Sequence, residues 1–64
     1  MEKFPMYKLA DKRKRAGLTQ SELAERVGLK YAAISSYETG VSFPKRKTLE
    51  KMAEVLNCNA ADLI

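Results

Sequence analysis

Histidine is absent from the sequence, and cysteine occurs once, at Cys58. Without histidine the chain cannot build a histidine-containing zinc finger, and it has no imidazole to act as a general base. A single cysteine excludes an internal disulfide and any CxxC metal site. The serines and the acidic residues also lack an adjacent base. We therefore predict a protein that is not an enzyme and that needs no metal or other cofactor.

Long apolar runs are missing as well. No stretch approaches the ~18 residues that a membrane span needs. Residues 1–5 carry a glutamate and a proline where a signal peptide would need apolar residues. These absences predict a cytoplasmic protein with no membrane partner. The length of 64 residues suffices for one domain, which we expect to cover residues 1–64 around a thin core.

Glycine and proline mark two helices in the first half of the chain. Pro5 suits a first helical turn and Gly17 suits a helix stop, which predicts a helix over residues 6–16. Residues 19–22 then form a Thr-Gln-Ser-Glu capping box, which is typical of a helix start. Gly28 can end this second helix because it adopts the left-handed conformation without steric cost.

The second half of the chain predicts three more helical segments. One spans residues 31–39 and stops at Gly40, and the next follows Pro44 with the clearest apolar stripe of the chain. Asn59 can cap a short last helix over residues 60–64. Strand-like alternation, repeats and low-complexity segments are absent, so the predicted fold is all-α, a compact five-helix bundle. The apolar stripe consists of Leu49, Met52, Ala53 and Leu56.

Residues 20–39 meet the demands of a helix-turn-helix, in which two helices cross steeply through a short turn. The crossing point needs a small residue, and the turn needs a residue that tolerates a positive φ. An apolar residue must seal the turn, and two residues of the second helix must point into the core. Each feature alone is common, but their joint occurrence in one window is specific. The matching residues are Gln20, Leu23, Ala24, Gly28, Leu29, Ile34 and Tyr37.

Residues 17–28 and 34–40, followed by Pro44, resemble the Cro/phage-repressor type of helix-turn-helix, also called XRE-like. The resemblance extends from about Leu9 to Ile64 and implies a lambda-repressor-like DNA-binding domain. It further implies a sequence-specific transcriptional regulator of double-stranded DNA, expected to be a repressor. In that family the third helix enters the major groove, and dimers read symmetric half-sites. A homodimer, at least on DNA, is therefore a possible partner arrangement.

The resemblance places base reading on the outer face of the third helix, at Tyr31, Ala32, Ser35 and Ser36. None of these side chains can make the bidentate contacts by which Arg, Asn or Gln read guanine or adenine. Lys30 replaces the usual capping Ser or Thr before this helix, and it is the one strong donor able to reach a guanine edge. We therefore expect backbone contacts and DNA shape to carry much of the selectivity.

Basic residues outnumber acidic ones by 12 to 8 and gather in two blocks, residues 12–15 and 45–47. Either block alone could be a solvated helix face. Because the two blocks flank the helix-turn-helix pattern, we interpret them as a phosphate-facing surface. By the resemblance, Thr19, Gln20 and Thr39 also face the DNA backbone. The full predicted backbone set is Arg13, Thr19, Gln20, Thr39, Lys45, Arg46 and Lys47.

The resemblance also implies an ion pair between Arg13 and Glu38 that ties the first helix to the third. An acid at the end of a helix stands at the unfavourable pole of the helix dipole. A cationic partner explains why Glu38 is tolerated there.

Other functions stay open at this stage. The fold also serves antitoxins or adaptors whose main partner is a protein, and the sequence pattern does not separate them from DNA regulators. RNA binding is a third possibility, although Tyr31 is the one exposed aromatic candidate for base stacking. A dimer would have to form through the domain itself, with Val55 and the apolar end Leu63-Ile64 as candidate contacts.

Overall fold

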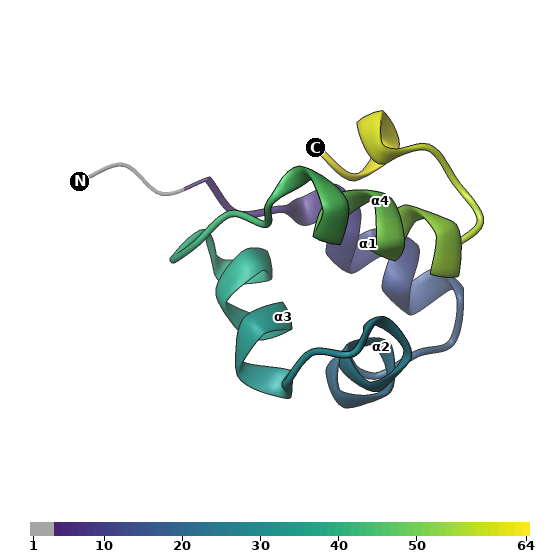
Figure 1. Ribbon diagram of the computed structural model, residues 1–64, viewed down its shortest axis with the longest axis horizontal. Helices are drawn as coiled ribbons and strands as arrows, with labels where there is room; N and C mark the ends of the chain where they lie inside the picture. Colours follow the sequence, from purple (N-terminus) through teal and green to yellow (C-terminus); the bar gives the residue numbers. More distant parts are fainter. Residues whose placement is uncertain (1–3) are drawn as a thin grey trace.

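The computed structural model describes residues 4–64, and within that range every regular element is helical. Helices α2 and α3 cross steeply (Figure 1), α2 also packs against α4, and the short last helix packs against both α1 and α4. The all-α class predicted from the sequence is confirmed. The elements are α1 (Tyr7–Arg15), α2 (Gln20–Val27), α3 (Tyr31–Thr39), α4 (Arg46–Val55) and the short helix η1 (Ala60–Leu63).

The predicted count of five helices is slightly off, because four elements of the described residues are α-helices and the short last one, Ala60–Leu63, is a 3-10 helix. The N–H of Asp62 donates to the carbonyl of Asn59 at 2.9 Å, and the N–H of Asn59 donates to the Asp62 carboxylate at 3.0 Å. These i to i+3 bonds suffice for so short a run, and 3-10 geometry is common in such pieces. The single turn brings Leu63 into the core.

The core draws one large, fully buried side chain from each of the five elements. Burying such a side chain contributes about 1.5–3 kcal/mol relative to leaving it in water. In α4 the predicted stripe faces this core, with Leu56 half-buried at its end. The core therefore depends on every element at once, as expected for a small domain without cross-links. The five side chains are those of Leu9, Leu23, Ile34, Met52 and Leu63.

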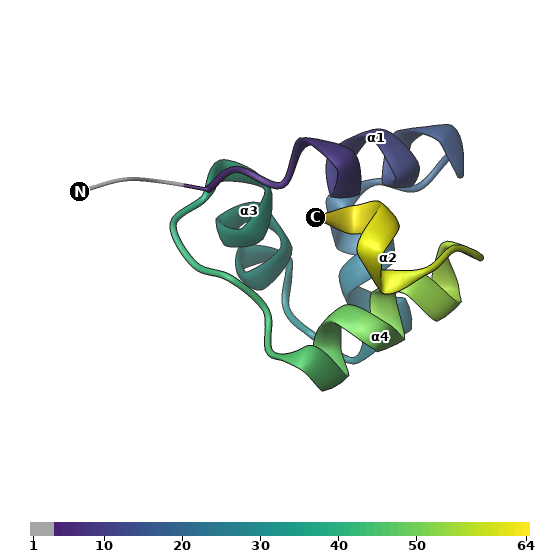
Figure 2. The same ribbon diagram turned by 90° about the horizontal axis from the view of Figure 1, so that it is seen from above.

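The segment before α1 passes over the end of α3 (Figure 2). The N–H of Met6 donates to the carbonyl of Tyr37 at 3.2 Å, and the side chain of Met6 is buried. This hydrogen bond joins the residue before α1 to the last part of α3. Among the described residues, no helix is both long and apolar enough to cross a membrane.

Candidate nucleic-acid interface

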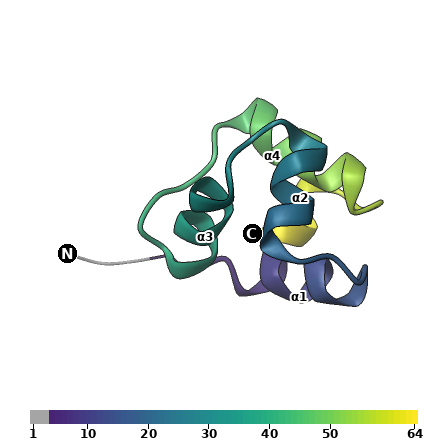
Figure 3. The same ribbon diagram turned by 90° about the horizontal axis from the view of Figure 1, so that it is seen from below.

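The turn between α2 and α3 has the geometry that the sequence pattern predicts. Gly28 adopts the left-handed conformation with φ +74°, and the N–H of Leu29 donates to the carbonyl of Ala24 at 2.8 Å. Ala24 and Ile34 are buried where the two helices meet, and Tyr37 is half-buried behind them. Figure 3 shows how the turn connects α2 to α3, and the first two residues of α3 are exposed. The helix-turn-helix is thus packed on its inner side and exposed at the outer start of α3.

The start of α2 is closed by the predicted capping box. The hydroxyl oxygen of Thr19 accepts from the N–H of Glu22 at 3.1 Å, and Glu22 Oε1 accepts from the N–H of Thr19 at 2.8 Å. Hydrogen bonds to the ionised carboxylate, first from the Thr19 N–H and then from its side chain, lower the pKa of Glu22. The capping box holds the first turn of α2 in place at the surface.

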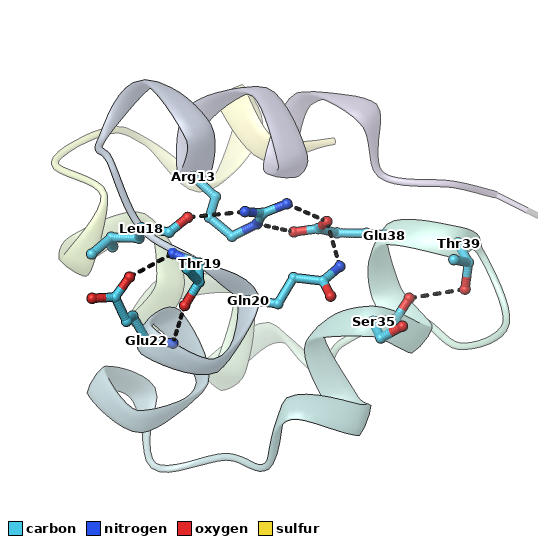
Figure 4. Close-up of polar contacts among 8 residues, drawn as sticks. All are labelled: Arg13, Leu18, Thr19, Gln20, Glu22, Ser35, Glu38 and Thr39. Carbon is cyan, nitrogen blue, oxygen red and sulfur yellow. Dashed lines mark hydrogen bonds and ion pairs between the residues drawn. The ribbon is translucent and has the colours of Figure 1, made fainter.

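Arg13 and Glu38 form the predicted ion pair between α1 and α3. Arg13 Nε donates to Glu38 Oε2 at 2.6 Å, and Nη2 donates to Oε1 at 2.9 Å (Figure 4). Arg13 Nη1 also donates to the carbonyl of Leu18 at 2.9 Å. The hydrogen bond to Glu38 is the main reason that the pKa of Arg13 is raised. The pair is bidentate, which is the strongest geometry for this combination of side chains.

The structure argues against a direct phosphate contact by Arg13. The residue is 8% exposed, and its guanidinium already donates to three acceptors within the protein. A side chain so enclosed offers little surface to a DNA backbone. We therefore assign Arg13 to the pair with Glu38 and remove it from the backbone-contacting set.

The first basic block is not a single surface. Consecutive helical residues are about 100° apart around the axis, so four adjacent cations point in different directions. Arg13 is buried, Lys12 is half-buried, and Lys14 is exposed. Arg15 is exposed and pairs with Asp11 at 2.9 Å. The interpretation of residues 12–15 as a common phosphate-facing surface is therefore wrong.

The outer face of α3 carries the residues predicted to read bases. Tyr31 is 55% exposed, and Lys30 and Ala32 are also exposed. Ser35 and Ser36 lie one turn further along and are half-buried. Lys30 makes no capping hydrogen bond with its side chain, so its amine is available to a ligand. The open part of the face is thus concentrated at the N-terminal end of α3.

Thr39 is exposed, but its hydroxyl is already engaged. Thr39 Oγ1 donates to the carbonyl of Ser35 at 2.9 Å. A hydroxyl has one hydrogen to donate, and a phosphate oxygen can only accept. A phosphate contact by this hydroxyl therefore requires that the bond to Ser35 be broken first.

The second basic block forms the start of α4 as one exposed group. Lys45 precedes the helix, and Arg46 and Lys47 form its first turn, which contains no acidic residue. Arg46 Nε lies 3.6 Å from Glu50 Oε2, but its side chain is 90% exposed, so this pair holds it weakly. The amides at the helix start and the three cations together favour an anion.

One contact was not predicted from the sequence. Gln20 Nε2 donates to Glu38 Oε1 at 2.9 Å, which joins the first residue of α2 to the end of α3 (Figure 4). The sequence partly indicated this contact, because Glu38 lies at the negative end of a helix, where an ionised carboxylate needs hydrogen-bond donors. It did not reveal that Gln20 is one of those donors, since 18 residues separate the two positions.

Comparisons with known proteins agree with this geometry. Residues 9–63 match the helix-turn-helix family. The transcriptional repressor RstR of the cryptic phage CTXphi, from Vibrio cholerae serotype O1, is 30% identical over 56 residues. That match covers 88% of this chain and 50% of RstR, so the chain spans about half the length of this curated relative.

Two solved structures have the same fold. The restriction-modification controller protein C.AhdI from Aeromonas hydrophila matches with a TM-score of 0.83 and 26% identity, covering 89% of this chain and 83% of C.AhdI. SinR, the master regulator for biofilm formation, was solved in complex with DNA. It matches with a TM-score of 0.80 and 34% identity, covering 86% of this chain and 89% of SinR. These relatives are named as a repressor, a controller protein and a master regulator, and the chain itself belongs to the helix-turn-helix family.

Proposed function

We propose that this protein binds specific sites on double-stranded DNA and represses transcription, with α3 in the major groove. The observation that carries the proposal is the exposed N-terminal part of α3, at Tyr31 and Ala32, in a domain that also presents the capped start of α2 and the exposed basic start of α4. A helix with one open face and flanking phosphate-binding groups suits B-form DNA. The repressor role is supported by the name of RstR, and DNA binding by the SinR complex.

The grip on the DNA backbone comes from the two helix starts, and Lys30, which is predicted to reach a guanine edge, adds a further positive charge. Thr19 and Gln20 lie at the start of α2, and residues 45–47 lie at the start of α4. Lysine and arginine contacts to phosphates are independent of sequence and weaken as salt is raised. We expect four cations, Lys30 and residues 45–47, to supply most of the salt dependence.

Base reading by α3 is modest in this proposal. Tyr31 can donate one hydrogen bond or contact a thymine methyl group, and Ala32 can contact the same methyl. Ser35 and Ser36 are half-buried, so they contribute less than fully exposed side chains would. Phosphate contacts and DNA shape then supply the remaining selectivity, as the sequence predicts.

Binding-site selection from random duplexes, followed by affinity measurements over a range of salt, tests the proposal. We expect an enriched site and a log–log salt slope of about −4 for each bound chain, from four released counterions. An unrelated duplex should bind more weakly but with a similar slope. Preference for RNA over duplex DNA, or no enrichment, would contradict the proposal. The cytoplasmic location stays a prediction that fractionation of the host cell can check.

We also propose that two copies bind together on DNA. The protein measures 31 × 22 × 21 Å, and adjacent major-groove half-sites on one side of DNA are about 34 Å apart. Two neighbouring copies would come close to touching if the longest axis of each lies along the DNA. Of the predicted contacts, Leu63 belongs to the core, Val55 is half-buried, and Ile64 is exposed. Ultracentrifugation on a duplex with two half-sites should give two chains per duplex, and one chain at saturation would contradict this.

A protein partner remains the second candidate function. Phe4, Val41 and Phe43 are large apolar side chains left exposed around the end of α3. Contiguous exposed apolar patches often mark binding sites for other proteins, and these three side chains are the candidates for such a site here. If the main partner is a protein, substituting Val41 and Phe43 with serine will abolish its binding and leave DNA affinity unchanged. Unchanged binding of the partner protein by this double variant would contradict the second candidate function.

A further inference from the structure

The carboxylate of Glu38 lies beside the start of α2, where an acid opposes DNA binding. Its side chain is 7% exposed, and it sits one residue before the end of α3, at the negative pole of the helix. Two bonds from Arg13 and one from Gln20 offset this unfavourable position. Both Arg13 Nη2 and Gln20 Nε2 donate to the same oxygen, Oε1.

The bond between Glu38 and Gln20 sets the direction of the Gln20 amide. An ionised carboxylate can only accept hydrogen bonds, so Gln20 must turn Nε2 toward Glu38. One N–H of this nitrogen is then bound at 2.9 Å. The second N–H remains for another acceptor at the surface, because Gln20 is only half-buried.

The same contacts form a closed path around the start of α2. Arg13 Nη1 donates to the carbonyl of Leu18, and the other side of its guanidinium holds Glu38. Glu38 in turn accepts from Gln20, two residues after Leu18 (Figure 4). This series of hydrogen bonds therefore starts just before α2, passes through α1 and α3, and returns to the first residue of α2. It holds α2 and α3 in a defined position relative to each other.

We propose that Glu38 is a positioning residue for DNA binding. It holds the Gln20 amide so that its free N–H meets a phosphate while the outer face of α3 meets the bases. Arg13 keeps Glu38 in place and neutralises its charge, so DNA approaches a neutral pair. The proposal rests on the proposed DNA-binding function, and it adds a role for an acid that contacts no DNA.

The substitution Glu38→Gln tests the role, because charge alone predicts the opposite result. Removing an acid near DNA should by itself strengthen binding. If Glu38 positions Gln20, Glu38→Gln should instead weaken binding about tenfold, to the selected site and to an unrelated duplex alike. In a chain that already carries Gln20→Ala, Glu38→Gln should cause no weakening. Glu25→Gln, which removes an exposed acid of α2, is the charge-matched control and should not weaken binding.

Glu38→Asp is the second variant, since it keeps the charge but shortens the reach to Gln20. It should show the same dependence on Gln20. Affinities are compared at a temperature at which circular dichroism shows every variant folded. Equal weakening with and without Gln20, or stronger binding by Glu38→Gln, would overturn the proposal and leave Glu38 a purely structural role.

An NMR measurement separates this proposal from the proposed function. The side-chain NH2 signals of Gln20 should shift in Glu38→Gln and stay unchanged in Glu25→Gln. A wild-type chain that binds no duplex would refute the proposed function whatever these signals do. A wild-type chain that binds duplex, with Gln20 signals insensitive to Glu38, would refute the positioning role alone.

Discussion

Gly40 lies against the backbone of Pro5, closely enough that a Cβ on Gly40 would stand 2.7 Å from the Pro5 nitrogen. Gly40 also has φ +84°, which favours glycine. It thus meets two separate demands: it ends α3, and it admits the segment that leads into α1. At this point the end of the proposed recognition helix is in close contact with the segment that leads into α1.

Gly40→Ala should therefore be far more costly than an ordinary glycine substitution. We expect a loss of about 3 kcal/mol in the free energy of unfolding, from left-handed strain and from the steric clash together. Gly17→Ala is the matched control, because Gly17 has φ +74° but nothing within 4 Å of its added Cβ. It should cost about 1 kcal/mol. Urea unfolding measures both, and equal losses would contradict the close approach to Pro5.

Arg13→Met should destabilise the fold by about 3 kcal/mol, because it leaves the enclosed carboxylate of Glu38 without its counter-charge. The double substitution Arg13→Met with Glu38→Met should recover much of that loss, since no charge is then left unpaired. Arg15→Met is the control, as its pair with Asp11 is exposed and should contribute under about 0.5 kcal/mol. Thermal unfolding that ranks the two arginines equally would contradict this account.

Lys30→Ser should stabilise the protein and weaken its binding to DNA. Serine can cap α3, which the side chain of Lys30 does not, and a good cap contributes about 1 kcal/mol. Losing one cation should reduce the magnitude of the salt slope by about 1. Lys51→Gln, on the exposed face of α4, is the control and should leave the slope unchanged. A Lys30→Ser protein with undiminished affinity would remove Lys30 from the interface.

The capping box predicts a specific acid response. The pKa of Glu22 is lowered in the folded protein from its ordinary value near 4.5. The ionised form is therefore favoured by folding, and its contribution is complete above that ordinary value. It is lost as the pH falls through the lower folded value. An NMR titration of the Glu22 carboxyl carbon should give a midpoint below 4.5, and Thr19→Ala should raise it.

The sequence predicted the elements that local chemistry determines. Thr19, Gly28 and Gly40 define helix ends by their own conformational preferences, so α2 and α3 begin and end where they were predicted. The last turn was misjudged because a run of four residues gives little evidence of whether its bonds are i to i+3 or i to i+4. The block at residues 12–15 was misread because charge was counted along the chain, although α1 distributes it around its axis.

The site was only partly predictable for the same reason. The resemblance supplied the pairing of Arg13 with Glu38, but it gave no sign that Glu38 also accepts a hydrogen bond from Gln20. That contact depends on how α2 packs against α3, and it joins residues far apart in sequence. The approach of Pro5 to Gly40 is likewise tertiary. Neither contact leaves a pattern in the order of the residues.

Binding-site selection repeated with Gln20→Ala and Tyr31→Ala is the most direct test of the central claim that α3 reads bases while the start of α2 grips the backbone. Gln20→Ala should weaken binding to all duplexes by a similar factor and leave the selected sequence unchanged. Tyr31→Ala should instead change the preference at one base position. The reverse pattern, a changed preference with Gln20→Ala and a uniform loss with Tyr31→Ala, would contradict this assignment of the DNA-facing surfaces.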